Sequence, residues 1–362
     1  MDPLRLHWCS PPDTGQAKPT DPYNMGKLDM GEVRDFVQEA EELGVDTLLF
    51  GISKRLPDPI PVIGALSQVT DRVKFMLAYR PGLMTPPLFA QVVNTLAWMT
   101  EGRIALNIVA GISPAEQAGY GDFLSHDERY ARCNEFLHIL RGMWEDETPL
   151  SYDGQHYTLK DTELGLPYKG AKSETGGNAA VRPQIYIGGA SAVAQQTALD
   201  LGDCWLRYGD TPQALAESAR PLIEGGRRVG TRMHVLARPT REEAVAELAT
   251  LVREPDENHK AWVRNALNTT DSEAVTSSYK LAATATDEWL SPHIWTGAVA
   301  YRGGPALCIV GSYQEVAHYI HSYKTAGITE FIFSGWPTRN EMHTFYTHVA
   351  PLIRSLEATE TP

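Results

Sequence analysis

Short apolar runs alternate along this chain with longer segments in which apolar residues recur at helical spacing. The first repeat is complete: an apolar run over Leu4–Trp8, helical spacing over Val33–Leu43, Gly44 where a helix C-cap belongs, and a second apolar run over Thr47–Phe50. This order is typical of a βαβ unit, in which a helix joins two parallel strands.

The same alternation continues toward the C-terminus and predicts eight strands in all. Helical patterns over 316–325 and 342–356 flank the last of them. Strands alternating with helices in this number predict a closed β/α barrel, the TIM barrel, and we expect residues 1–362 to form one such domain. The six strands after the first repeat are predicted at Val73–Ala78, Ile104–Val109, Gln184–Ile187, Cys204–Leu206, Arg232–Leu236 and Glu330–Phe333.

Two stretches interrupt the alternation, at 162–182 and at 253–304. We expect both in loops at the C-terminal ends of the strands, where barrel enzymes build their active sites. The second stretch carries polar helical patterns at 262–268 and 273–283. It is predicted to be a lid-like insertion, because long ordered loops tend to be functional.

Charge and cysteine content narrow the class of protein. The net charge of −13 argues against a nucleic-acid or anionic membrane surface. The four cysteines form no CxxC pair, so neither a disulfide framework nor a metal site is indicated. The chain shows no signal-peptide pattern and no apolar run of membrane-spanning length. We therefore expect a cytoplasmic protein that acts on a small molecule.

The strand around Arg232 and His234 is unusual because it carries two polar side chains on one face. Strands of a parallel sheet are covered on both sides, and a buried guanidinium needs an anionic partner. Two interpretations remain open. Either the pair faces a ligand, or Arg232 pairs with a neighbouring carboxylate and His234 with the backbone.

A capping box at Ser125–Glu128 predicts a helix that begins near His126. His126 and Tyr130 then share one face of the first turn, where free amides and the helix dipole favour an anion such as phosphate. The alternative is a polar first turn that faces solvent.

Two further features lie at strand ends or inside strands. The turn 188–191 precedes a helical pattern over 193–201, so Gly189 and Ser191 could cradle a phosphate or simply form a tight connection. Asn107 is a polar residue within an apolar strand, which indicates a hydrogen bond to a ligand or to a neighbouring loop.

Together these motifs make the chain similar to the bacterial luciferase-like flavin-dependent monooxygenases, and within them to the alkanesulfonate monooxygenase branch. The resemblance covers nearly the whole chain. It is carried by Leu106-Asn107-Ile108-Val109-Ala110-Gly111, Ser125-His126-Asp127-Glu128-Arg129-Tyr130, Ile187-Gly188-Gly189-Ala190-Ser191, the strand of Arg232 and His234, Tyr301-Arg302-Gly303-Gly304, and Ser334-Gly335-Trp336-Pro337.

The resemblance implies that FMN binds at the C-terminal ends of the barrel strands, in a homodimer or homotetramer. It places the FMN phosphate near His126, Tyr130, Gly189 and Ser191. It also places Asn107 and Ala78 near the isoalloxazine ring, with a non-prolyl cis peptide at Ala78–Tyr79.

The resemblance further implies two-component chemistry, in which a separate NAD(P)H-dependent flavin reductase supplies FMNH2. Oxygen would then be activated as a flavin peroxide. Arg232 would stabilise the peroxide or an anionic substrate, His234 would steer protonation, and Arg302 would close over the flavin with the insertion. The chain has no Gly-x-Gly-x-x-Gly nicotinamide fingerprint after a strand, which agrees with this picture.

The chain departs from the alkanesulfonate pattern where substrate is expected. The candidate substrate-binding residues in this region are Trp8, Leu56, Arg207, Tyr208 and Trp336. We therefore expect oxygenation of a small organic substrate, with an alkanesulfonate or related organosulfur compound as one candidate. The alternatives are a tailoring oxygenase of secondary metabolism, a deazaflavin-dependent oxidoreductase, and a flavin-binding protein without turnover.

Overall fold

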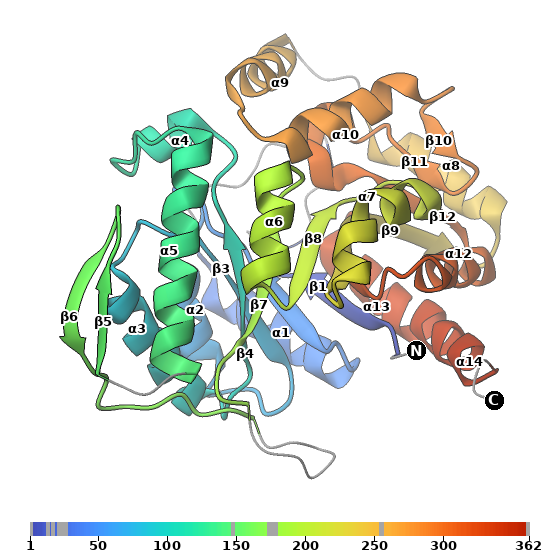
Figure 1. Ribbon diagram of the computed structural model, residues 1–362. Helices are drawn as coiled ribbons and strands as arrows, with labels where there is room; N and C mark the ends of the chain where they lie inside the picture. The colour runs from blue at the N-terminus through green and yellow to red at the C-terminus, as the bar shows by residue number, and fades with distance from the viewer. Residues whose placement is uncertain are drawn as a thin grey trace.

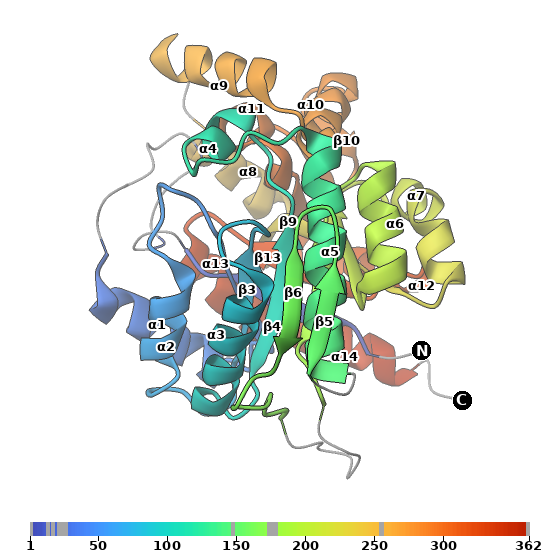
Figure 2. The same cartoon turned by 60° about the vertical axis from the view of Figure 1, so that its left-hand side comes forward.

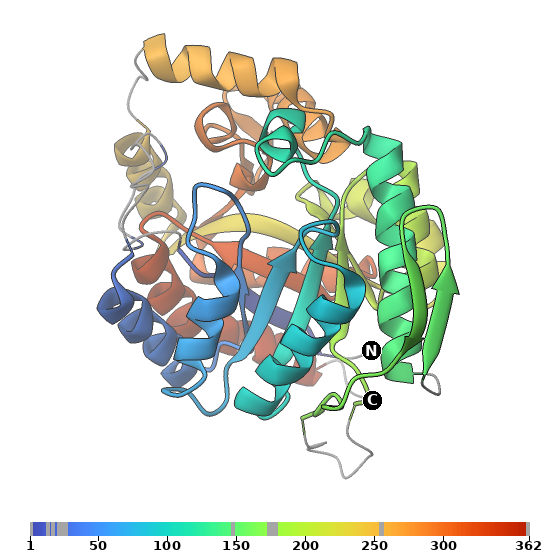
Figure 3. The same ribbon diagram turned by 90° about the vertical axis from the view of Figure 1, so that its left-hand side faces the viewer.

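A computed structural model describes residues 3–11, 15, 19, 28–145, 149–171, 180–252 and 257–359 of the chain. Its centre is a ring of parallel strands, which closes where the last strand pairs with the first and where β8 pairs with β9. The predicted eight-stranded TIM barrel is confirmed (Figures 1 and 3). In ring order the strands are β1 (Arg5–Cys9), β2 (Thr47–Phe50), β3 (Lys74–Tyr79), β4 (Ile104–Val109), β7 (Gln184–Gly188), β8 (Cys204–Tyr208), β9 (Arg228–Arg238) and β13 (Glu330–Ser334).

Helices surround the ring and bury one apolar face each against it. Their ends follow local sequence signals: the side chain of Asp29 caps α1, Gly44 follows α1 with φ +80°, and Ser312 and Glu315 form a capping box on α12. The surrounding helices are α1 (Met30–Glu42), α2 (Pro59–Leu66), α3 (Pro86–Met99), α5 (His126–Glu145), α6 (Ala192–Leu201), α7 (Pro212–Glu224), α8 (Arg241–Leu251), α12 (Tyr313–Thr325), α13 (Thr338–Thr344) and α14 (Ala350–Thr359), with a π-helical turn, η2 (Phe345–Val349), between the last two. None of the described helices is long and apolar enough to cross a membrane.

Side chains alternate between the two faces of each strand and so divide the core in two. On β8, Trp205 belongs to the large outer core between strands and helices, whereas Cys204 and Leu206 belong to the smaller core inside the ring. The interior is therefore apolar at mid-height. Polar side chains occupy it only toward the two ends of the strands.

The end of the barrel interior at the strands' N-termini contains an ion-pair network around Glu330. This carboxylate is fully buried and pairs with Arg228 and with His7, whose Nε2 lies 3.2 Å from Glu330 Oε2. The other ring nitrogen of His7 lies 3.4 Å from Asp46. Burial alone would lower the pKa of His7, but its hydrogen bonds to Asp46 and Glu330 raise it above the ordinary value.

This network makes stability depend on pH in a direction that follows from His7. Because its pKa is raised in the folded protein, its contribution is complete below the ordinary histidine pKa of about 6.5 and is lost as pH rises through the folded value. We expect the free energy of unfolding to fall above pH ~6.5, by at most about 1.4 kcal/mol per pH unit. Urea unfolding at several pH values measures this slope. His7→Gln should flatten it and the exposed-site control His343→Gln should not; equal slopes in all three proteins would contradict the assignment.

Several strands outside the ring were not predicted. The strand β12 (Cys308–Ser312) pairs in parallel with the distal half of β9, and β10 (Trp289–Ser291) and β11 (Ile294–Trp295) extend that edge. The strands β10 and β11 are short and lie inside the stretch that was interpreted as an insertion. A hairpin of β5 (Leu150–Asp153) and β6 (Thr158–Thr162) follows α5 (Figure 2).

The predicted position of the stretch 162–182 was wrong for the part that the structure describes. Pro167 accepts a hydrogen bond from Trp98 Nε1 at 2.9 Å, and Lys169 pairs with Glu101 at 2.6 Å. Both partners lie at the end of α3 that leads into β4, so this segment crosses the N-terminal ends of the strands. Residues 172–179 lie outside the described part of the chain.

The described part of the predicted insertion, residues 257–304, lies at the C-terminal ends of the barrel strands (Figure 1). Figure 1 shows α9 (Glu257–Thr269) and α10 (Glu273–Thr284) above the C-terminal ends of the strands, and α11 (Val299–Arg302) leads from them back to the barrel. Arg129, at the start of α5, pairs with Asp271 at 2.6 Å. The insertion is thereby fastened to the helix that carries His126 and Tyr130. Residues 253–256 are not among the described residues.

Candidate active site

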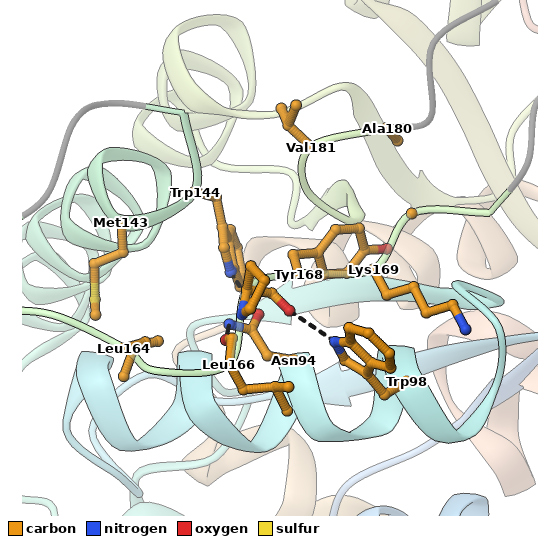
Figure 4. Close-up of a pocket in the computed structure, with 12 residues that line it drawn as sticks. Asn94, Trp98, Met143, Trp144, Leu164, Leu166, Tyr168, Lys169, Ala180 and Val181 are labelled. Atoms are coloured by element: carbon orange, nitrogen blue, oxygen red, sulfur yellow. Dashed lines mark hydrogen bonds between the residues drawn. The ribbon is translucent and has the colours of Figure 1, made fainter.

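A cavity of about 510 Å³ lies beside α3 and α5, away from the mouth of the barrel (Figure 4). Its main polar groups are already paired within its own wall. Asn94 accepts from Trp144 Nε1 at 2.8 Å and donates to Leu166 O at 2.7 Å, and Lys169 lies over the ring of Trp98. This cavity therefore presents little unused polar chemistry, and the candidate site lies at the C-terminal mouth instead.

Arg232 projects from the inner face of β9 at that mouth. In the sheet register it lies between Tyr208 of β8 and Ile332 of β13. Its Nη2 donates a hydrogen bond to Cys9 Sγ at 3.3 Å, so a thiol from the end of β1 contacts this guanidinium. The contact holds the cation inside the barrel wall.

His234 lies one step further along β9 and contacts three other segments. Its Nδ1 is 2.8 Å from the carbonyl oxygen of Pro305, and its Nε2 is 3.0 Å from Ser334 Oγ. Its ring stacks on Trp336, with centroids 3.6 Å apart and planes 10° apart. The backbone partner foreseen in one interpretation of this strand is present.

The electrostatics of this cluster keep His234 neutral. Burial lowers its pKa to about 3, and the positive charges of Arg232 and Arg302 act in the same direction. Because a carbonyl can only accept a hydrogen bond, the proton of the neutral ring must sit on Nδ1, with Nε2 accepting from Ser334. The structure thus brings Arg232, His234 and Arg302 into one electrostatic unit.

The insertion returns to the barrel through a tight turn after Arg302. Gly303 has φ +75°, a conformation that side chains rarely adopt. A Cβ on Gly304 would lie 2.2 Å from the ring of Tyr208, so the main chain packs directly against this aromatic ring. Tyr208 therefore forms part of the wall beneath the insertion, as its predicted place in the site requires.

The predicted phosphate site forms a second cluster at the ends of β7 and α5. The rings of His126 and Tyr130 are 5.0 Å apart, and the Tyr130 hydroxyl is 3.5 Å from the carbonyl oxygen of Gly188. Ser191 caps α6 through the amide of Ala194. The capping box that begins α5 is also present, with Ser125 N donating to Glu128 at 2.8 Å. The structure therefore brings the predicted phosphate-side residues together.

Gly189 completes this cradle. It has φ +149°, and an added Cβ would lie 2.5 Å from the Tyr130 hydroxyl and 2.7 Å from Ala194. Burial also raises the pKa of Tyr130, so its hydroxyl remains a neutral donor near physiological pH. A hydroxyl, a capped helix N-terminus and a backbone without a side chain fit a phosphate group.

Asn107 lies between the phosphate-side cluster and the interior of the barrel. It is 9% exposed, and its Oδ1 has no hydrogen-bond partner among the described residues. Ala78 is its neighbour in the register of β3 and β4, and a Cβ added to Gly188 would lie 3.5 Å from that oxygen. A buried acceptor between two small residues fits a flat ring that offers an N–H, as an isoalloxazine does.

The expected cis peptide at Ala78–Tyr79 is not present. Among the described residues the cis peptide bond is Trp336–Pro337. Ala78 and Tyr79 instead continue the parallel ladder with β4, and the ring of Tyr79 stacks on Phe89 outside the barrel, 3.7 Å between centroids. Along β3 the side chains therefore alternate as in a regular strand. Ala78 faces the interior of the barrel, and Tyr79 faces the surrounding helices.

Two predicted substrate residues face the wrong side of the barrel wall. Trp8 is fully buried against Phe345 of the helical layer, with ring centroids 5.9 Å apart. Arg207 donates to Ser218 of α7 at 2.8 Å and lies 3.6 Å from Asp210. The structure corrects both predictions, because alternate residues of a strand point to opposite faces.

The other candidate substrate residues lie at the mouth or near it. Trp336 covers the ring of His234, and Leu56 is half-buried in the loop after β2, with a methyl group 3.7 Å from the Cβ position of Gly51. Sequence reasoning missed Cys9 and Ser334. Both could have been found by alternation, because Cys9 shares its strand face with His7, and Ser334 with Glu330.

Comparisons with known proteins bear on the family and the fold. The model of the luciferase-like monooxygenase family matches residues 4–330. Riboflavin lyase, solved with a modified FMN and riboflavin, is 18% identical, with a TM-score of 0.71 over 98% of this chain and 92% of that one. EDTA monooxygenase from Chelativorans sp. BNC1 is 17% identical, with a TM-score of 0.74 over 98% and 94%.

A third structure shows that the barrel also accommodates other cofactor chemistry. An F420-dependent secondary alcohol dehydrogenase is 17% identical, with a TM-score of 0.65 over 98% of this chain and 100% of that one. At these identities the structures establish a shared fold, and the family model establishes descent. The chain belongs to the luciferase-like monooxygenase family, and the enzyme class that this membership gives is that of the flavin-dependent monooxygenases.

Proposed function

We propose that the protein is an FMNH2-dependent, two-component monooxygenase that oxygenates a small anionic organic substrate. The observation that carries the proposal is the buried His234 beside Pro305 at the mouth of the barrel, whose pKa is lowered by burial and by the positive charges of Arg232 and Arg302. Two cations in a partly enclosed site suit an anion. A guanidinium group can form paired, charge-assisted hydrogen bonds with the oxygens of an organic anion.

The residues around the mouth fit FMN as the cofactor. Tyr130, Gly189 and Ser191 would hold the phosphate, and the Oδ1 of Asn107 would accept a hydrogen bond from the ring. When bound in its reduced form, FMN supplies the electrons that activate O2 for transfer of one oxygen atom. The protein's own contribution is to orient the substrate anion with Arg232 and Arg302. The insertion would act as a lid that excludes water.

The substrate side of the proposal rests on the wall opposite the phosphate cluster. Tyr208, Trp336 and Cys9 surround Arg232 and His234 there. This wall combines aromatic surface with positive charge, which suits an organic anion such as an alkanesulfonate or a related organosulfur compound. EDTA monooxygenase is named for another organic anion, which supports this class.

The test is an aerobic assay with FMN, NADH and a separate NAD(P)H-dependent flavin reductase, over a panel of alkanesulfonates and carboxylated amines. Sulfite or aldehyde release above the no-enzyme background is the expected result. Hydrogen peroxide without any oxygenated product across the whole panel would contradict the proposed substrate class. Omitting the reductase should abolish turnover, and light scattering on the same preparation should show a dimer or tetramer.

A deazaflavin-dependent dehydrogenase is the second candidate, favoured by the shared barrel of the F420-dependent alcohol dehydrogenase. Titrations separate the two. The monooxygenase binds FMN and consumes O2, whereas a deazaflavin enzyme would bind F420 more tightly and reduce it with an alcohol. A protein that binds FMN and shows neither activity would be a flavin-binding protein without turnover.

The Gly189 cradle gives a direct test of the phosphate site. We expect Gly189→Ala to weaken FMN binding about tenfold or more, because the new methyl group must displace the Tyr130 hydroxyl or Ala194 and strains a positive φ. Fluorescence titration with FMN measures the change, and circular dichroism checks the fold. Gly165→Ala is the matched control, since its Cβ would meet nothing within 4 Å. Unchanged affinity in Gly189→Ala would place the phosphate elsewhere.

A further inference from the structure

His234 makes more contacts than a proton-transfer residue needs. Its two ring nitrogens contact Pro305 and Ser334 at 2.8 and 3.0 Å, and Trp336 covers one face of the ring. The side chain of Ser334 is itself buried, with 5% of the residue exposed. Neither nitrogen can meet a ligand unless one of these bonds breaks.

Pro305, the partner of His234 Nδ1, lies close to Arg302 in the chain. Pro305 belongs to a single 3₁₀ turn, η1 (Gly304–Ala306), that begins two residues after Arg302. The same stretch is tied to β9 a second time, because the amide of His234 donates to the carbonyl of Leu307 at 2.8 Å. The end of the insertion is therefore held by the main chain and by the side chain of one residue.

Gly303 and Gly304, which precede Pro305, are confined by packing and by backbone conformation. The main chain of Gly304 packs on the ring of Tyr208, and Gly303 occupies a backbone conformation open mainly to glycine. A displacement of Pro305 would therefore carry Gly304, and with it Arg302, away from the barrel mouth. The carbonyl of Pro305 would then lose its donor in a partly buried setting, which costs free energy.

We propose that His234 is a positioning residue that fixes Arg302 over the barrel mouth by holding the Pro305 carbonyl. It does so as the Nδ1–H tautomer, which that carbonyl requires and to which the Ser334 hydroxyl can donate at Nε2. The inference deepens the proposed function, since Arg302 is one of the two cations assigned to the substrate. It replaces the role in protonation that the sequence suggested for His234. The hydrogen bond between His234 and Pro305 joins two groups of the protein itself, so the proposal can be tested without FMN.

Two substitutions of His234 separate the positioning role from any other. Asn places an amide N–H close to the position of Nδ1, so His234→Asn can retain the donor to Pro305. Gln extends its amide toward Ser334, so His234→Gln abandons that donor. Both variants lack the imidazole, so they differ from each other only in whether an N–H can reach the Pro305 carbonyl.

The readout is hydrogen–deuterium exchange of the amides in peptides spanning 299–307, in protein without FMN. We expect exchange in His234→Gln to be about tenfold faster than in wild type, and exchange in His234→Asn to stay within about twofold. Equal exchange in the two variants, whether raised or unchanged, would overturn the proposal. Because no flavin is present, this result is independent of whether the protein is an FMN monooxygenase.

A measurement on the folded wild-type protein covers the case in which a variant does not fold. Long-range ¹H–¹⁵N spectra of protein labelled with ¹⁵N-histidine distinguish the two neutral tautomers and the imidazolium, and the His234 signal is assigned by its shift in Ser334→Ala. The expected form at pH 7 is the neutral Nδ1–H tautomer. A neutral Nε2–H ring, or an imidazolium, would overturn the proposal.

Discussion

Replacing Arg232 with alanine is expected to reduce substrate oxygenation by at least about 10²-fold while the protein remains folded. The side chain lies at the barrel mouth, where it donates a hydrogen bond to the thiol of Cys9. Removal of the guanidinium leaves the substrate anion with Arg302 alone. The measurement is product formation in the reductase-coupled assay, with circular dichroism and thermal unfolding on the same samples.

Two comparisons make this result interpretable. Arg232→Lys keeps a charge but loses the planar fork, so partial activity is expected. Arg34→Ala removes an exposed arginine that pairs with Asp35 on α1 and should leave activity unchanged. If Arg232→Ala fails to fold, Arg232 has a structural role. If Arg232→Ala folds and retains full activity, the proposed substrate site is wrong.

Replacing Glu330 with alanine is expected to destabilise the protein by about 3–5 kcal/mol. This carboxylate is fully buried in the N-terminal end of the barrel interior, between Arg228 and His7. Its removal leaves both partners charged or polar in a buried setting without their shared anion. Urea unfolding at pH 7 gives the difference in free energy directly.

Two control variants separate the effect of the buried charge from that of an exposed ion pair. Glu330→Gln keeps the size of the side chain and an acceptor for Arg228, so a smaller loss is expected. Asp35→Ala breaks an exposed ion pair, in which both side chains are half-exposed, and should cost less than about 1 kcal/mol. A loss in Glu330→Ala no larger than that in Asp35→Ala would show that the network adds little to stability.

The barrel itself could be read from local pattern. Each of the eight ring strands overlaps a predicted strand, because a strand buried on both faces is a short apolar run and the helices between them show helical spacing. The strand β12 was missed although Cys308–Val310 is an apolar run like those of the ring strands. It is stabilised by pairing with the far half of β9, which no local pattern reveals.

A motif that includes its own geometry predicts which residues lie together. The capping box at Ser125 sets the first turn of α5, and the turn around Gly189 opens α6, so the phosphate-side residues were brought together as expected. The wall of the substrate side depends on which face each strand residue occupies. There the prediction took Trp8 and Arg207, whereas the interior side chain at the end of β1 is Cys9.

The sequence by itself determined the order of strands and helices, the polar strand of Arg232 and His234, and the interruption at 253–304 that contains Arg302. These follow from periodicity and from caps, which act over a few residues. Only the tertiary structure decided that Cys9 contacts Arg232, that Pro305 contacts His234, and that Glu330 joins Arg228 and His7. The partners of these contacts come from different strands or from the insertion. They are set by the closure of the ring and the register of its strands, which arise from the whole sheet at once.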